Sequence, residues 1–241
     1  MAVSYGGIVP PITPGDPSNT GTGTSIVSQS WTISGTGLVL LVGVRLENHA
    51  TVVVNSLTWS LGSGSAYEVG TSRLSDCYSS VWAIPAPTAG AGTFTMTLSA
   101  SVAWDMNADY FLGADQTTPC PLADTTPTSA NGAGSPITLT MTPTNVTAND
   151  AAWCSSGSAL AGGLTSVSPT QTYLWNSATG YRIGVGALDA VYGGTNSGGQ
   201  ATGVGVRIQT PQAAVLLAWM PTTHVVAGPV KDVMIPSGMT P

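Results

Sequence analysis

The sequence predicts an all-β protein built as a sandwich or a barrel, and three observations support this fold class. Only 7% of the 241 residues are charged, which leaves few side chains for the polar face of amphipathic helices. Threonine, serine and the 30 glycines are spread along the chain, and these residues favour strands and turns. Short apolar or alternating runs recur with turn residues between them, as in β-sandwiches and barrels.

The first 24 residues are expected to form an extended arm. Tyr5, Ile8 and Ile12 make it too apolar for a simple tether, so it is suited to lie across a neighbouring subunit and to order on contact. Four prolines exclude a helix and disfavour a central strand: Pro10, Pro11, Pro14 and Pro17.

Residues 25–221 are expected to form the sandwich domain. Residues 37–46, GLVLLVGVRL, are almost continuously apolar, which is typical of a strand covered on both faces. Residues 92–99, GTFTMTLS, and 136–143, PITLTMTP, alternate apolar residues with threonine, as half-buried strands do. A long loop is expected at 113–135, and a polar tail at 222–241. The other expected strands are SIVSQSWTI, TVVVNSLTWS, SSVWAIPAP, SVAWDMNADYFLG, DAAWCSSGSAL, TYLWNS, YRIGVGALDAVY, ATGVGVRIQT and AAVLLAWMP.

Charge and hydropathy exclude two classes of partner. The net charge is −6, and the five basic residues are scattered along the chain, whereas a phosphate-binding surface needs a cluster of them. We therefore expect no nucleic acid and no anionic membrane as partner. The longest apolar runs, LVLLV and AAVLLAWM, fall short of the roughly 20 residues that span a bilayer. The N-terminus has no secretory signal pattern, so we expect synthesis in a cytoplasm.

Motifs of nucleotide binding and nucleophilic catalysis are missing from the sequence. The sole lysine, Lys231, lies in the tail and belongs to no Walker loop, and no G-x-S-x-G occurs. His49 lies in an expected turn, and His224 follows the last expected strand. We therefore predict that the protein is not an enzyme, with no catalytic, cofactor-binding or metal-binding residues and no cofactor.

Acidic residues alternate in DMNAD, which places Asp105, Asn107 and Asp109 on one face of a straight strand. This spacing resembles the first half of a calcium loop, but Tyr110 stands where that loop needs glycine, and no glutamate closes the set. We interpret the three residues as a solvent-facing polar edge, with Ala108 and Tyr110 facing inward. A metal site is the alternative.

Paired carboxylates could perform glycosidase chemistry, and two pairs are available in the sequence. They are Asp105 with Asp109, and Asp115 with Asp124. The second pair includes an acid of FLGADQTTP, residues 111–119, which we interpret as the exit from a strand into a loop. Gly113 permits the turn, and Asp115 can accept hydrogen bonds from backbone N–H groups two or three residues ahead. A ligand site is the alternative interpretation.

Cysteine and tryptophan are both assigned structural roles. The three cysteines, Cys77, Cys120 and Cys154, form no C-x-x-C, so we expect reduced, buried thiols and no intramolecular disulfide. With only two phenylalanines present, tryptophan is expected to fill the core or a subunit interface. An exposed platform for carbohydrate is the alternative. All seven tryptophans lie in strand-like runs: Trp31, Trp59, Trp82, Trp104, Trp153, Trp175 and Trp219.

Several stretches between Ser34 and Ser156 together resemble a β-sandwich module that recurs in phage virion proteins and bacterial surface proteins. They are SGTGLVLLVGV, VWAIPAPTAGAGTFTMTLSAS, FLGADQTTP and SPITLTMTPTNVTANDAAW. In such modules the second stretch forms a hairpin, and AAVLLAWMP looks like the closing strand. The resemblance implies a single jelly-roll-like antiparallel β-sandwich with extended N- and C-terminal arms, and it implies no chemistry.

Members of this group are usually structural or adhesive. We therefore expect a phage virion protein made in the host cytoplasm, either a capsid decoration or cement protein or a tail component. Its expected partners are the major capsid protein or tail proteins, and copies of itself in a homo-oligomer. A carbohydrate-binding or adhesive module for host recognition is the alternative, with a glycan as partner.

Overall fold

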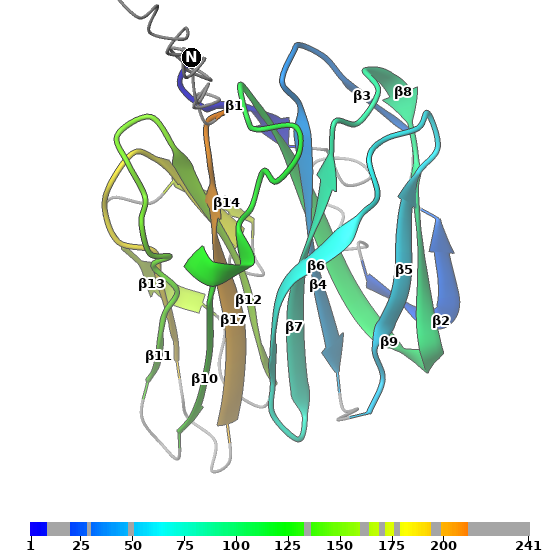
Figure 1. The fold of residues 1–241 in the computed structure, drawn as a ribbon. Coiled ribbons are helices and arrows are strands. Elements are labelled where there is room, and N and C mark those ends of the chain that lie inside the picture. The colour runs from blue at the N-terminus through cyan, green and yellow to red at the C-terminus, as the bar shows by residue number, and fades with distance from the viewer. Residues whose placement is uncertain are drawn as a thin grey trace, which may run out of the picture.

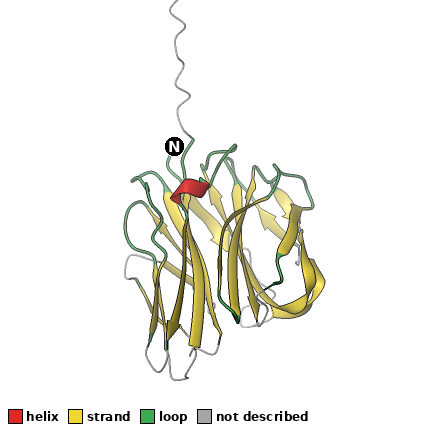
Figure 2. Cartoon of the chain, turned by 60° about the horizontal axis from the view of Figure 1, so that its bottom comes forward, coloured by secondary structure: helices red, strands yellow, loops and turns green. Residues whose placement is uncertain are grey.

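The computed structural model is built almost wholly of antiparallel strands (Figure 1). Among the described residues, the only helical element is one 3₁₀ turn, Leu122–Asp124, which Figure 2 shows in red among the strands. The prediction of an all-β sandwich is confirmed, and its jelly-roll connectivity stays a prediction. The structure describes residues 1–8, 20–27, 30–47, 51–132, 136–159, 164–168, 172–175, 179–193 and 199–211.

Two large sheets, each from one half of the chain, form the central sandwich. Strands β6 and β7 of the first sheet pack against β10, β12 and β17 of the second (Figure 1). The first sheet has the order β1 (Ser4–Ile8), β9 (Phe94–Leu112), β4 (Val39–Glu47), β7 (Cys77–Pro85) and β6 (Tyr67–Arg73). The second has the order β10 (Thr126–Gly132), β17 (Gly199–Ile208), β12 (Ala151–Ala159), β15 (Thr179–Ile183) and β14 (Thr172–Trp175).

The core between these sheets is apolar and contains one large aromatic ring at its centre. Leu41 and Phe111 of the first sheet meet Trp153 and Val206 of the second, and all four side chains are fully buried. Gly43 on β4 permits this close approach, because a Cβ there would lie 2.9 Å from the ring of Trp153 and would also overlap Ser155. Alternate residues of β4 face the opposite way, so the strand is covered on both faces, as its apolar sequence predicts.

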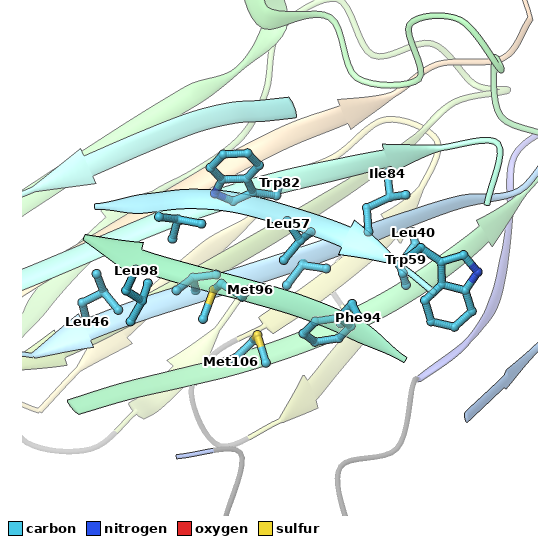
Figure 3. Packing of buried hydrophobic residues seen from close by; sticks show 14 of the residues in the cluster. Leu40, Leu46, Leu57, Trp59, Trp82, Ile84, Phe94, Met96, Leu98 and Met106 are labelled. Carbon is cyan, nitrogen blue, oxygen red and sulfur yellow. The ribbon is translucent and has the colours of Figure 1, made fainter. Parts of the chain in front are cut away.

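An additional layer of strands covers the outer face of the first sheet. The long strand β9 belongs to this layer with its first part and to the sheet with its second part. Between Gly23 and Ser25 of β2, the partner on β9 changes from Val102 to Thr97, which marks a bulge in β9. Before the bulge, β9 pairs with β5 (Val54–Trp59) and β2 (Thr20–Val27), and after it with β4, β2 and β1. Figure 3 shows the core formed in this way, where residues of β5 and early β9 pack onto β4 and β7.

A small sheet covers the outer face of the second sheet (Figure 1). Its strands are β11 (Ile137–Thr140), β16 (Asp189–Tyr192) and β13 (Leu164–Val167). Gly203 and Gly205 of β17 face this layer, and the carbonyl of Met141 lies where a Cβ of Gly205 would be. The alternating glycines therefore let the backbone after β11 pack directly onto β17. A two-stranded sheet of β3 (Trp31–Ile33) and β8 (Gly90–Gly92) completes the described fold.

The structure differs from the sequence prediction in several elements. The expected strand YRIGVGALDAVY is divided between β15 and β16, which belong to different sheets, and β6 and β13 were not predicted. FTMTLSAS and SVAWDMNADYFL belong to the single strand β9. The stretch from VWAIPAP onward forms no hairpin, because β7 pairs with β4 and β6 instead. The expected loop at 113–135 contains β10. Residues 4–8 and 20–24 of the expected arm belong to strands paired with β9, since main-chain hydrogen bonds need no side-chain pattern. AAVLLAWMP and the tail 222–241 lie outside the described residues.

Candidate functional site

The acidic row of β9 faces the interior, so its interpretation as a solvent-facing edge is wrong. Asp105 and Asp109 are only 8% and 2% exposed. Ala108 and Tyr110 do face inward as expected, but into the other core, because both faces of β9 are covered. The alternation in DMNAD correctly predicted that the acidic side chains share one face of β9. It could not predict that the second sheet covers that face.

Asp109 is bound by two aromatic donors from distant parts of the chain. The hydroxyl of Tyr5 donates to Oδ1 at 2.9 Å, and Nε1 of Trp153 donates to Oδ2 at 2.7 Å. Burial raises the pKa of this carboxyl to about 7, although both hydrogen bonds act to lower it. The ring of Tyr5 also packs edge-on against Phe111, with 5.5 Å between ring centroids. These contacts tie β1 and both sheets of the sandwich together.

The raised pKa of Asp109 predicts that stability falls as pH rises from about 4 to about 7. The folded state holds this proton more tightly than the unfolded chain, whose aspartate pKa is near 3.8. Between pH 5 and 8 the free energy of unfolding should fall by roughly 3 kcal/mol from this group. Asp109→Asn should flatten the dependence in urea titrations at these pH values, and Tyr5→Phe should extend it to higher pH. Parallel curves for wild type and Asp109→Asn would contradict the assignment.

Asp105 is paired with a basic residue across the ladder. Nη2 of Arg45 on β4 lies 3.6 Å from Oδ2 of Asp105. The methylene groups of Arg45 pack over Gly157 of β12, where a Cβ would overlap them, and its Nη1 donates to the carbonyl of Ser158 at 3.4 Å. Asp105 and Asp109 thus belong to separate local networks. Asp105 forms an ion pair with Arg45, and Asp109 accepts hydrogen bonds from Tyr5 and Trp153.

The interpretation of FLGADQTTP as a strand exit is confirmed. Gly113 has a φ of 72°, and Oδ1 of Asp115 accepts hydrogen bonds from the N–H groups of Thr117 and Thr118, each at 2.8 Å. Nε2 of Gln116 donates to the carbonyl of Ala114 at 2.8 Å and to that of Leu38 at 3.3 Å. The motif therefore closes its own turn and fastens it to the turn before β4.

An open pocket of about 250 Å³ lies beside this turn. Its walls come from Gly35–Leu38, from Ala86, Pro87 and Ala89, and from Gln116. These residues come from SGTGLVLLVGV, VWAIPAPTAGAGTFTMTLSAS and FLGADQTTP. Ala86 has a φ of 46°, which is strained for a residue with a Cβ. No titratable side chain lines the pocket, and its polar side chains are the hydroxyl of Thr36 and the amide of Gln116.

A buried ion cluster, which the sequence did not reveal, holds one end of the second sheet. Arg207 on β17 donates from Nη1 to Asp124 at 2.8 Å and lies 2.9 Å from Asp150 through Nη2. Burial raises the pKa of Asp150, but the N–H groups of Thr210 and Thr147 and the Arg207 charge outweigh it and leave that pKa lowered. The pKa of Asp124 is lowered for the same kind of reason, with Asn145 as an additional donor.

The cysteines and tryptophans lie mainly in the interior. Cys77, Cys120 and Cys154 are buried thiols that form no disulfide, as expected. Burial raises the pKa of Cys120, which disfavours a nucleophilic thiolate. The interpretation of tryptophan as core is confirmed for Trp59, Trp82 and Trp153. Trp104 is partly buried against the core that contains Trp59 and Trp82. The side chains of Trp31 and Trp175, and all of Trp219, His49 and His224, lie outside the described residues.

Across the described part of the chain, no three His, Cys, Asp or Glu side chains gather in a way that could hold a metal ion. Within those same residues, no helix has the length and apolar character needed to cross a bilayer. Comparisons of the chain with protein-family models, with curated proteins and with solved structures find no match.

Proposed function

We propose that the protein is a structural component of a phage virion, either a capsid decoration or cement protein or a part of the tail. It acts through contacts with other virion proteins and with copies of itself, and it has no catalytic role. It reaches the virion after synthesis in the host cytoplasm. The jelly-roll-like module to which the sequence is similar serves this kind of role.

The main support for the proposal is the burial of charged side chains. At least four of the eleven acidic residues are buried, and those with described partners are bound by groups of the same chain. The described surface therefore carries fewer charges than it would if all the charged side chains faced solvent. The centres of protein–protein interfaces are depleted in charged residues, so broad faces of this kind suit packing against other subunits.

The meeting of three motif stretches at one pocket gives further support. The turn at 34–38, the turn at 86–89 and Gln116 are far apart in sequence but form one end of the sandwich. Their glycine, proline and amide residues each have a role in shaping the backbone there. The resemblance therefore involves residues that build the fold, which is what a structural module shares among its members.

The carbohydrate-binding alternative depends on exposed aromatic rings. Trp59, Trp82 and Trp153 are at most 8% exposed, which removes them from any sugar-stacking platform. The pocket beside Gln116 is lined by no aromatic side chain. Protein–protein contact is therefore the better supported of the two roles.

The test is to find the protein in particles. Virions produced from the genome that encodes the chain should be purified on a density gradient and probed with an antibody against the recombinant protein. We expect the protein to co-sediment with particles, and immunogold labelling in the electron microscope then separates capsid from tail. Recovery only in the particle-free fractions would overturn the proposal. Glycan-array binding together with that result would support the adhesive alternative.

A further inference from the structure

Strand β1 separates the buried carboxyl of Asp109 from the edge of the first sheet. In the sheet order, β1 is the edge strand and β9 lies next to it, with Ile8 opposite Asp109. The hydroxyl of Tyr5 binds Oδ1 of Asp109 from this side, whereas Trp153 binds Oδ2 from the second sheet. Leu41 lies across the ladder on β4. If β1 left its place, Asp109 would lie on an edge strand and water would reach its carboxyl.

Among the described contacts, two side chains and a short ladder hold β1 in this place. The strand has five residues, SYGGI, and its pairing with β9 shifts between Tyr5 and Gly7. Val3, just before the strand, is 1% exposed, and its N–H donates to the carbonyl of Asn149 at 2.8 Å. Tyr5 packs against Phe111, while the two glycines bring no side chain and lose more backbone entropy on ordering than other residues. A short edge strand of this kind opens locally, at a free energy below that of global unfolding.

The titratable groups around Asp109 leave its own proton as the one that responds near neutral pH. Asp105 and Arg45 lie further along the ladder on the same face, and they pair with each other at 3.6 Å. Cys120 and Tyr67 belong to the same core, and burial raises the pKa of both groups, so both stay neutral. Within the described part of the chain, Asp109 is therefore the group of this core whose charge changes near neutral pH.

We propose that β1 is a pH-dependent latch, which leaves β9 more often as pH rises while the rest of the sandwich stays folded. With β1 docked, burial raises the pKa of Asp109 to about 7. With β1 away, water solvates the carboxylate, and the pKa falls toward its ordinary value of 3.8. The open state therefore holds the proton less tightly, so opening is favoured as pH rises from about 4 to about 7 and levels off above that. In this range the ratio of open to docked chains should rise by up to about tenfold per pH unit.

Opening uncovers the side of β9 that β1 occupies. Backbone groups of residues 109–112 then lie at a sheet edge, where extended peptide segments bind, and the ring of Phe111 loses the cover of Tyr5. The latch thus gives the protein two states that differ in the surface they offer to a partner. It is a property of the folded chain and does not depend on the virion role proposed above.

Hydrogen exchange of the intact protein, measured residue by residue with NMR, tests the latch. The N–H of Val3 reports on β1, and the N–H groups of β7, which is paired on both sides, report on global unfolding. Each rate is divided by that of an unstructured peptide at the same pH to give a protection factor. Between pH 5 and pH 7 the protection of Val3 should fall by roughly 10- to 50-fold. It should also be lower than the protection of β7 and insensitive to dilute urea, because opening one strand exposes little surface.

Asp109→Asn is the neutral analogue of the protonated carboxyl. Its amide can accept a hydrogen bond from Trp153 and donate one to the hydroxyl of Tyr5, but it cannot ionise. The protection of Val3 should therefore become independent of pH in this range. Tyr67→Phe is the matched control, because it removes a hydroxyl from the same core that bonds only to backbone groups among the described contacts. It should keep the pH dependence of the wild type.

Tyr5→Phe gives a second test that does not depend on the folding of Asp109→Asn. It keeps the ring beside Phe111 but removes a hydrogen bond that favours the ionised carboxyl, so the fall in protection should continue above pH 7. Two results overturn the latch. Exchange of Val3 that is as slow as that of β7, with the same urea dependence, means that β1 leaves only when the whole protein unfolds. The same pH dependence in wild type and in both variants means that Asp109 does not control the opening.

Discussion

Gly205→Ala should strongly destabilise the protein. A Cβ at this position would overlap the carbonyl oxygen of Met141 and would lie 2.6 Å from its carbonyl carbon. These are backbone atoms, so relief requires the segment after β11 to move off β17, which opens the core between the second sheet and the small sheet. We expect a loss above about 4 kcal/mol and a fall in Tm of roughly 10 °C or more, measured by calorimetry or urea unfolding.

Gly203→Ala is the matched control, because Gly203 lies two residues earlier on the same face of β17. There the nearest atom to a new Cβ is Sδ of Met141 at 2.5 Å, the end of a flexible side chain, followed by Cβ of Ser156 at 2.8 Å. Repacking can absorb part of this overlap, so we expect a smaller loss of about 1–3 kcal/mol. Equal stability of Gly205→Ala and wild type would show that the small sheet does not pack on β17 in this way.

Arg207→Met should produce the second large loss. It removes the guanidinium that binds both Asp124 and Asp150, and Asp150 is fully buried. Two carboxylates would then share an interior site without a counter-charge, which typically costs about 3–5 kcal/mol. Urea unfolding at pH 7.5 measures the loss. Arg207→Lys keeps the charge but not the fork of donors, so its stability should lie between those of wild type and Arg207→Met.

The loss caused by Arg207→Met should shrink on acidification. In wild type the lowered pKa values of Asp124 and Asp150 make their contribution to stability present above about pH 4 and lost as pH falls below it. Without Arg207 these carboxyls should take up protons at higher pH, so the variant gains stability relative to wild type between pH 7.5 and 4.5. A difference that stays constant over this range would show that the cluster is not the source of the loss.

Local periodicity was sufficient to predict the strands with strong side-chain patterns. Residues 94–98 and 137–140 alternate between buried and more exposed positions as their threonine spacing predicts, and the apolar run of β4 is covered on both faces. By contrast, β1 (SYGGI) and β10 (TPTSANG) carry little apolar alternation. They are strands because neighbouring strands pair with their backbones, and this information is not contained in either segment itself.

The buried polar groups could not be predicted from sequence for a related reason. DMNAD has the pattern of a strand with one polar face, and that face is buried by groups as distant as Tyr5 and Trp153, which are 104 and 44 residues away from Asp109. The cluster of Arg207 draws on Asp124 and Asp150, which are 83 and 57 residues away. Short-range reasoning succeeded for Asp115, whose partners are two and three residues ahead. Hydrogen bonds between residues close in sequence could therefore be predicted, and those between residues far apart in sequence could not.

The division of the two large sheets between the halves of the chain has a consequence for biosynthesis. Every strand of the first sheet lies before residue 113, and every strand of the second lies after residue 125. A growing chain can therefore complete the first sheet and its outer layer while the second half is still on the ribosome. The face bearing Leu41 and Phe111 must then wait uncovered until Trp153 and Val206 arrive. During that interval the nascent protein presents a broad apolar surface, the state in which aggregation competes with folding and chaperones act.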